Sequence, residues 1–216
     1  MRIDVKGTII PSEDKWVYDW LGYDSTSPND INQALEKANG ERVDVYINSG
    51  GGDVFAGSEI YSALREYSGN VKIHITGIAA SAASVIACAG KSEMSPTAQF
   101  MVHNVSASGT NGDYHAFDKT SEILQNANEA IAAAYVDKTK MSKEEALNLM
   151  DKETWLTAEK ALEYGFVDEI SQNKNLQLSA SMCNLIPQSL IDKLNEKRAD
   201  EKIKAQERLN KMKGEI

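Results

Sequence analysis

A serine at position 81 stands where a strand-like segment gives way to a run of small residues. The segment VKIHITG (71–77) alternates like a half-buried strand, and Gly77 is expected to end it. The Ala-rich run 79–89 favours a helix, which places Ser81 in the first helical turn. Unpaired backbone N–H groups there stabilise an oxyanion, so this serine could attack a carbonyl carbon. A serine that only caps a buried helix is the alternative.

Ser84 lies three residues beyond Ser81, inside the same predicted helix. Its hydroxyl is expected to bond to the preceding turn of the helix instead of facing a cleft. We therefore expect Ser84 to be dispensable for chemistry at Ser81.

Three consecutive glycines follow the strand-like segment RVDVYIN (42–48). Gly50, Gly51 and Gly52 leave the backbone without side chains, so a substrate carbonyl could approach a backbone N–H closely. This would supply half of an oxyanion hole. A phosphate-binding loop fits poorly, because neither a following Lys-Ser/Thr pair nor a G-x-G-x-x-G pattern is present. A plain glycine-rich loop remains the alternative.

A candidate general base ends a third apolar strand-like segment. His103 closes the segment FMVH just before a loop of Gly, Ser and Asn. The other two histidines are His74, within the segment 71–77, and His115, at the start of a long helical pattern. Both are expected to be structural or solvated.

Together these segments resemble the proteolytic subunit of the Clp protease family, and more closely its phage-encoded relatives that act as head maturation proteases. The resemblance covers residues 4–170. The glycine turn of the family matches 48–52, its G-x-A-A-S nucleophile motif matches 77–81, and its M-I-H strand matches 101–103. WLTAEKALEYGFVD (155–168) matches the closing motif of the family. Four motifs in the family's order make the resemblance specific.

The resemblance implies a role for each matched residue. Ser81 matches the nucleophile, His103 the general base, and the N–H groups of Gly51 and Ala82 the oxyanion hole. An extended substrate would pair with the backbone beside the glycine turn. The residues expected to bind it there are Gly52, Asp53 and Val54.

The acid of the catalytic triad is less clearly matched. The family's aspartate stands two residues before the aromatic residue of the closing motif, and that position here is Glu153, before Trp155. A glutamate can orient an imidazole as an aspartate does, although its longer side chain requires a different approach. Asp151 is the alternative acid.

The order of strand-like and helical segments predicts an α/β fold. The resemblance narrows this to the ClpP/crotonase-like superhelix of ββα units, with a handle helix at about 114–140 and a shorter helix after Ser142. Ser27, Pro28 and Asp30 form the signature of a helix start. We expect three parts: a ClpP-like serine protease domain (1–172), a polar linker (173–189) and a charged C-terminal helix (190–216).

Composition agrees with a soluble enzyme, and no cofactor is expected. The net charge of −9 argues against nucleic acid as a partner. No apolar run could span a membrane and the N-terminus is too charged for a secretory signal, so we expect a cytoplasmic protein, in host cytoplasm if phage-encoded. No C-x-x-C or H-E-x-x-H pattern indicates a metal site. Cys88 and Cys183 are expected to remain unpaired thiols.

The function that follows is an ATP-independent serine endopeptidase, processing phage scaffold and capsid proteins during head maturation. The given sequence begins almost at the first strand, so we expect it to lack the N-terminal segment that engages an ATPase in the family, which favours a self-contained phage protease. A second departure is that Gly50 replaces the proline of the family's glycine turn, which affects the rigidity of that turn. The resemblance also implies homo-oligomeric, heptameric rings that can stack through the handle. Two alternatives are a housekeeping ClpP peptidase partnered by an ATPase, and a catalytically inactive ring-forming scaffold.

Overall fold

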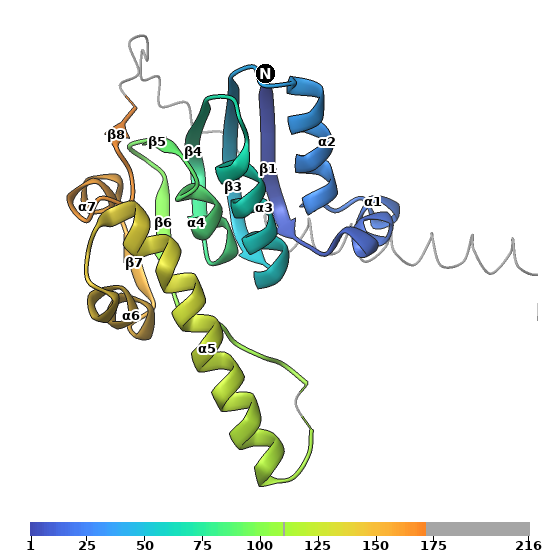
Figure 1. Cartoon of the computed structure of the whole chain (residues 1–216), viewed down its shortest axis with the longest axis vertical. Helices are drawn as coiled ribbons and strands as arrows, with labels where there is room; N and C mark the ends of the chain where they lie inside the picture. The colour runs from blue at the N-terminus through green and yellow to red at the C-terminus, as the bar shows by residue number, and fades with distance from the viewer. Residues whose placement is uncertain (110, 172–216) are drawn as a thin grey trace, which may run out of the picture. The chain divides into compact units, whose positions relative to one another are not determined.

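One largely parallel β-sheet organises the part of the chain that the computed structural model describes, residues 1–109 and 111–171 (Figure 1). These residues fall within a compact unit, Met1–Gln172. The linker and charged helix expected at 173–216 lie outside the described residues, as does Cys183. The strands are β1 (Arg2–Ile9), β2 (Ser25–Thr26), β3 (Val43–Gly52), β4 (Val71–Ala80), β5 (Lys91–Met94), β6 (Gln99–Val102), β7 (Thr154–Leu156) and β8 (Glu169–Ile170).

The sheet has the order β2-β1-β3-β4-β5-β8, and β6 pairs with β4 beyond the end of β5. All of these pairs are parallel, and within the described part of the chain only β6 and β7 run antiparallel. The helical elements are the 3-10 turn η1 (Ser12–Asp14), α1 (Lys15–Leu21), α2 (Pro28–Ala38), α3 (Val54–Glu66), α4 (Ala82–Ala87), α5 (Tyr114–Thr139), α6 (Lys143–Asp151) and α7 (Ala158–Glu163). The predicted α/β class is confirmed.

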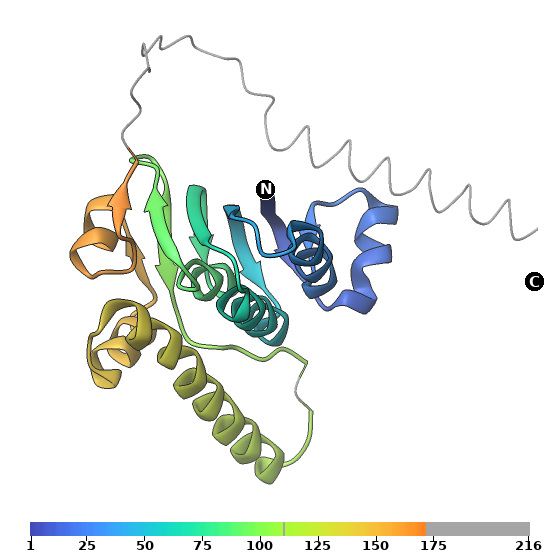
Figure 2. The same cartoon turned by 45° about the horizontal axis from the view of Figure 1, so that its top comes forward.

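The core lies between the sheet and the helices α2, α3 and α4, which Figures 1 and 2 show on one face. Alternate residues of each strand point into this layer because successive side chains of a strand face opposite ways. Burial of each large aliphatic side chain contributes roughly 1.5–3 kcal/mol. The central members of the core are Val5, Val45, Ile47, Ile60, Leu64, Ile73 and Ile75.

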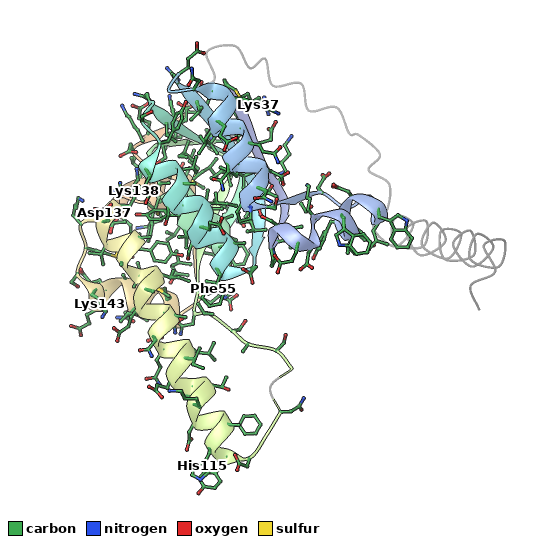
Figure 3. The ribbon with its side chains drawn as sticks, turned by 45° about the vertical axis from the view of Figure 1, so that its right-hand side comes forward. Lys37, Phe55, His115, Asp137, Lys138 and Lys143 are labelled. Atoms are coloured by element: carbon green, nitrogen blue, oxygen red, sulfur yellow. The ribbon has the colours of Figure 1, made fainter. Side chains whose placement is uncertain are left out.

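Helix α5 extends away from the sheet and from the helices that pack on it (Figures 1 and 3). Figure 3 labels Asp137 and Lys138 at the end of α5 beside the sheet and His115 at the opposite end. Near His115 the aromatic side chains of Tyr114 and Phe117 are 68% and 53% exposed. The predicted bounds of this helix, 114–140, agree with the structure to one residue.

The predicted helix starts are confirmed. The Ser27 side chain accepts the N–H of Asp30, whose carboxylate accepts the N–H of Ser27, and Pro28 occupies the first helical position. Ser142 and Glu145 form the same reciprocal pair at α6. Each capping residue satisfies an N–H that the helix leaves unpaired, an effect worth about 1 kcal/mol.

Two boundaries near Ser81 differ from the prediction. Strand β4 continues through Gly77 to Ala80, since Ile78, Ala79 and Ala80 pair with β6, and α4 begins only at Ala82. This pairing overrides both the break expected at glycine and the helix propensity of alanine. Ser81 is therefore the residue before α4, not a member of its first turn.

Gly77 is needed where β4 changes partners from β5 to β6. A Cβ at this position would lie 2.3 Å from the Asn48 side-chain oxygen. That oxygen accepts the N–H of Ile78 at 3.2 Å. The glycine thus makes room for an amide that bridges β3 and β4.

The glycines 50–52 also depart from the expected loop. Gly51 and Gly52 belong to β3 and pair with Thr8 and Ile9 of β1, past an irregularity in the register. The parallel strand β1 extends the sheet to the end of the glycine run, so these residues are fixed by strand pairing.

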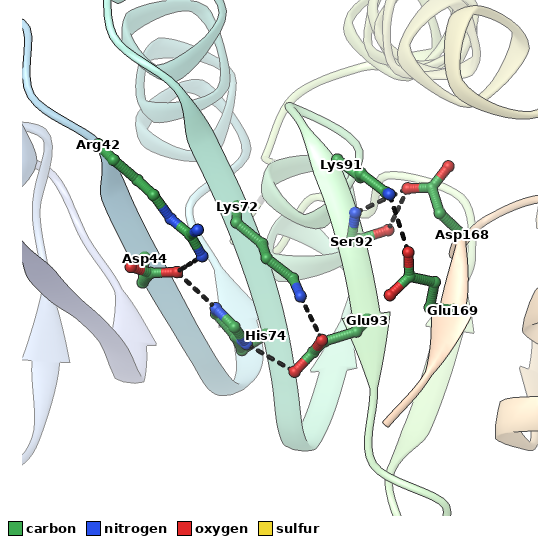
Figure 4. Close-up of polar contacts among 9 residues, drawn as sticks. All are labelled: Arg42, Asp44, Lys72, His74, Lys91, Ser92, Glu93, Asp168 and Glu169. Carbon is green, nitrogen blue, oxygen red and sulfur yellow. Dashed lines mark hydrogen bonds and ion pairs between the residues drawn. The ribbon is translucent and has the colours of Figure 1, made fainter. Parts of the chain in front are cut away.

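On the other face of the sheet, polar side chains form a hydrogen-bonded row, drawn in Figure 4. His74 lies between Asp44 and Glu93, with ring-nitrogen to carboxylate distances of 3.0 and 2.9 Å. Hydrogen bonds from Arg42 and His74 lower the pKa of Asp44. Burial opposes the charge of Glu93, but the bonds from Lys72 and His74 outweigh it and lower its pKa. His74 is structural, as predicted.

Asp168 ties the C-terminal part of this unit to the sheet. Its carboxylate accepts the N–H of Ser92 at 2.7 Å and pairs with Lys138, whose ammonium also donates to the carbonyl of Gly90 at 2.9 Å. Burial opposes the charge of Asp168, but these donors outweigh it and lower its pKa. The contacts join β5, α5 and the segment before β8.

We expect Asp168→Asn to lower the thermal unfolding midpoint by a few degrees at pH 7. The folded pKa of Asp168 lies below its ordinary value of 3.8, so its carboxylate stabilises the fold above that pH. This contribution is lost as the pH falls through the folded pKa, and the two proteins should then converge. Thermal unfolding between pH 7 and pH 2.5 measures this.

Glu169→Gln is the matched control. Glu169 pairs with Lys91, but the two side chains are 49% and 66% exposed. Such a surface pair contributes little, so its loss should leave the midpoint nearly unchanged. An equal effect of both substitutions would contradict the role given to Asp168.

Candidate active site

The ends of three strands bring the candidate residues together. Ser81 follows β4 directly and His103 follows β6 directly. These strands are parallel neighbours in which Ala80 pairs with Met101, so the segments that follow them leave the sheet side by side. Residues 22 positions apart in the chain thereby share one edge.

The hydroxyl of Ser81 and the imidazole of His103 lie within hydrogen-bonding distance. Ser81 Oγ and His103 Nε2 are 2.8 Å apart, and His103 is partly buried. The backbone N–H of Ser81 donates to the Met101 carbonyl at 3.1 Å, which fixes the serine against the strand that carries His103. A hydroxyl in contact with an imidazole is the arrangement of an activated nucleophile.

The backbone of Ser81 adopts an unusual conformation, with φ 55° and ψ −127°. A non-glycine residue at positive φ carries a cost of order 1–3 kcal/mol and needs support from its surroundings. The Ser81 carbonyl supplies part of it, since it accepts the N–H of Ser84 at 2.9 Å and the Ser84 hydroxyl at 2.6 Å. The sharp turn lies between a strand and a helix.

Gly51 contacts this turn from the neighbouring strand. Its φ is 98°, and a Cβ there would lie 2.6 Å from the Ser81 Cβ and 2.7 Å from the Ala80 carbonyl oxygen. Its N–H donates to the hydroxyl of Ser49 at 3.1 Å, and that hydroxyl donates to the Gly7 carbonyl. Gly51 thus lies against the turn at Ser81, with its N–H engaged by Ser49.

A pocket of about 330 Å³ opens beside Ser81 and His103. Gly52, Asp53 and Val54, the predicted substrate-binding residues, line it. The carboxylate of Asp53 caps α3 by accepting the N–H of Ala56 at 2.8 Å. Further apolar residues that the sequence analysis did not identify line the pocket, and most of them come from α4 and α5. Among them are Val85, Val105, Leu124, Ala127 and Ile131.

Within the described residues, neither candidate acid is hydrogen-bonded to His103. Glu153 has φ 47°, and its carboxylate accepts the Trp155 indole N–H at 3.5 Å. Asp151 accepts the side-chain amide of Asn104, the residue after His103, at 2.8 Å. Within residues 1–109 and 111–171, His103 Nδ1 has no hydrogen-bond partner.

Glu153 and His103 both adjoin the last pair of the antiparallel strands β6 and β7. In the antiparallel pair of β6 and β7, Val102 stands opposite Thr154. His103 directly follows Val102 and Glu153 directly precedes Thr154, so each is one residue from this last pair of the two strands. Asp151 reaches the same segment through its hydrogen bond to Asn104.

Other reactive groups lie away from this site. Cys88 follows α4 as a free thiol, as expected, and burial raises the pKa of this thiol to about 12. The described residues contain no group of three His, Cys, Asp or Glu side chains that could hold a metal ion. Among them, no helix is both long and apolar enough to cross a membrane.

Comparison with known proteins identifies relatives. The family model described as Clp protease matches residues 29–174. An ATP-dependent Clp protease proteolytic subunit of Bacteroides fragilis is 33% identical over 134 residues, covering 61% of this chain and 64% of the relative. The corresponding subunit of Streptococcus agalactiae is 31% identical over 138 residues, covering 62% and 70%. The chain thus matches somewhat less than two thirds of the Bacteroides protein.

The fold has a counterpart among solved structures. A ClpP1 mutant from Listeria monocytogenes superposes with a TM-score of 0.65 and 23% sequence identity, covering 80% of this chain and 92% of the other. This similarity confirms the predicted ClpP fold. With a family model that spans more than half of its residues, the chain belongs to the Clp protease family.

Proposed function

We propose that this protein is a serine endopeptidase that cleaves peptide bonds through an acyl-enzyme. The observation that carries the proposal is the 2.8 Å contact between Ser81 Oγ and His103 Nε2 at the edge of a pocket. An isolated pair of this kind would be weak support. Membership of the Clp protease family strengthens it.

In the proposed mechanism, His103 Nε2 takes the hydroxyl proton as Ser81 Oγ attacks the substrate carbonyl carbon. The N–H groups of Gly51 and Ala82 then stabilise the negative oxygen. Gly51 first has to release Ser49 or share its N–H with the substrate. His103 returns the proton to the leaving amine, and water activated by the same imidazole releases the acyl group.

The pocket suggests the substrate class. Its apolar lining favours a peptide with an apolar side chain before the scissile bond, because burying that side chain contributes roughly 1.5–3 kcal/mol. The extended substrate would run along Gly52, Asp53 and Val54, where β3 ends. A peptide that carries Leu or Met at that position is therefore a suitable test substrate.

The biological role we propose is processing of phage scaffold and capsid proteins, in host cytoplasm and without an ATPase. The motif resemblance to phage head maturation proteases supports this role. The curated relatives are named ATP-dependent, which favours a second candidate, a peptidase partnered by an ATPase. In either case we propose homo-oligomeric, heptameric rings, with the exposed end of α5 available for stacking.

We expect Ser81→Ala to reduce peptidase kcat by at least about 10³-fold, since the nucleophilic oxygen is removed. A fluorophosphonate should label the wild-type protein at Ser81 and should not label the variant. Ser95→Ala, in the turn between β5 and β6, is the control and should behave as wild type. Full activity of the Ser81 variant would refute the assignment of Ser81 as the nucleophile. A wild-type protein that is neither active nor labelled would refute the peptidase function and favour an inactive scaffold.

Gly51→Ala should reduce kcat/KM by about 10²-fold or more. The added methyl group would press on the Ser81 Cβ and the Ala80 carbonyl, and φ 98° is unfavourable for alanine. Gly50→Ala is the matched control, because a Cβ added at Gly50 would meet no atom within 4 Å. Steady-state kinetics on one peptide compare them, and similar losses in both variants would argue against a specific role for Gly51.

Glu153→Gln should reduce kcat/KM by about 10²–10⁴-fold if Glu153 orients His103. Asp151→Asn should retain most activity, since Asp151 contacts Asn104 and not the imidazole. The same peptide assay ranks the two. The reverse ranking would give the role to Asp151, and normal rates in both would indicate a Ser-His dyad.

Coexpression with the cognate scaffold and major capsid proteins tests the biological role. We expect both to be cleaved without an ATPase, and mass spectrometry of assembled particles to detect the new termini. The Ser81→Ala protein controls for host proteases. Intact proteins beside active wild-type enzyme would exclude head maturation, and cleavage that requires an added ATPase would support the partnered peptidase.

A further inference from the structure

Two buried hydroxyl groups near the candidate site have no role in the mechanism above. Ser84 of α4 is 0% exposed and Tyr135 of α5 is 1% exposed. Their oxygen atoms lie 2.8 Å apart, although the residues are 51 positions apart in the chain. Burying a hydroxyl group costs free energy unless it is hydrogen-bonded, and these two hydroxyls satisfy each other. Two apolar side chains could fill the same space, so we ask what the hydrogen bond between Ser84 and Tyr135 does.

The number of available protons determines which hydroxyl of the pair is the hydrogen-bond donor. The Ser84 hydroxyl donates its only proton to the Ser81 carbonyl oxygen at 2.6 Å. Tyr135 must then be the donor to Ser84 Oγ. Burial raises the pKa of Tyr135, so the phenol keeps the proton that it donates. The chain of bonds runs from Tyr135 through Ser84 to the carbonyl of Ser81.

That carbonyl belongs to the same peptide unit as the Ala82 N–H. A peptide unit is planar and almost always trans, so its C=O and N–H point in opposite directions. Holding the Ser81 oxygen toward Ser84 therefore turns the Ala82 N–H away from the helix interior. The Ser81 N–H is held independently by the Met101 carbonyl at 3.1 Å, so the turn is fixed on both sides.

We propose that Ser84 and Tyr135 are positioning residues that aim the Ala82 N–H at the oxyanion of the transition state. This inference rests on the proposed peptidase function and deepens it. Ser84 bonds to the preceding turn, as expected from sequence, but the carbonyl that accepts its hydroxyl belongs to the nucleophile itself. Through Tyr135, the long helix α5 supports the active-site backbone.

The contribution should be selective for the transition state. The oxygen that becomes negative exists only after Ser81 attacks, so a misdirected N–H should lower kcat with little change in KM. A peptide aldehyde, which forms a tetrahedral adduct with the serine, should lose affinity by a factor similar to the loss in kcat/KM. A purely structural pair would affect stability without this correlation.

The experiment is a double-mutant cycle of Ser84→Ala, Tyr135→Phe and the combined variant. Ser84→Ala should lower kcat by about 10-fold with KM within about twofold, because the N–H is misdirected but not removed. Tyr135→Phe, which leaves the Ser84 bond in place, should lower it less, by about threefold. Aldehyde inhibition constants should follow the same ranking.

The combined variant separates positioning from stability. Ser84→Ala leaves the buried Tyr135 hydroxyl without a partner, whereas the combined variant removes both hydroxyls, so its unfolding midpoint should recover from that of Ser84→Ala toward that of wild type. Its kcat should remain as low as that of Ser84→Ala. This comparison also remains informative if Ser84→Ala alone folds poorly.

Thr139→Val is the matched control. The Thr139 hydroxyl also donates to a backbone carbonyl, that of Tyr135, at 2.7 Å, but away from Ser81. Its loss should leave kcat and aldehyde affinity unchanged.

Two results would overturn the proposal while leaving the peptidase function intact: a wild-type kcat in Ser84→Ala, or recovery of kcat together with stability in the combined variant. A wild-type protein that no fluorophosphonate labels and that cleaves no peptide would overturn the peptidase function, and this inference with it.

Discussion

The backbone of Ser81 is the constraint on which the candidate site depends. Its N–H is bonded to Met101 on the neighbouring strand, and its carbonyl is bonded to Ser84 in the helix that follows. Between these anchors the residue sits at φ 55°, a conformation of order 1–3 kcal/mol above its relaxed state. The paired strands β4 and β6 hold it there, and the same pairing brings His103 to within 2.8 Å of the serine oxygen.

Close approach of backbone to backbone explains the glycines around this turn. Gly51 contacts Ser81 where any Cβ would overlap it, and Gly77 leaves room for the Asn48 amide where β4 changes partners. Gly57 of α3 faces Ala82, whose Cβ would lie 2.8 Å from a Cβ at the glycine. Small residues on both sides of the contact let a strand, a turn and two helices meet within a few ångströms.

Helix α5 connects the site to the rest of the fold. Its inner residues Leu124, Ala127 and Ile131 line the pocket, and Tyr135 reaches the hydroxyl of Ser84. At its C-terminal end Lys138 pairs with Asp168 and so joins the helix to the sheet edge. If the exposed end of α5 also mediates ring stacking, as we propose, a shift of this helix would change the pocket lining and the contact of Tyr135 with Ser84 beside the turn at Ser81.

The sequence by itself determined the features that depend on neighbours along the chain. The caps at Ser27 and Ser142, the bounds of α5, and the placement of His103 at a strand end follow from local spacing and residue type. The tertiary structure decided what depends on residues far apart in the chain. Pairing with β6 carries β4 through Gly77, pairing with β1 makes the glycine run part of a strand, and packing of α5 on α4 joins Tyr135 to Ser84. Local propensity could not reveal these features, because each arises from contacts whose free energy outweighs the preference of any single residue.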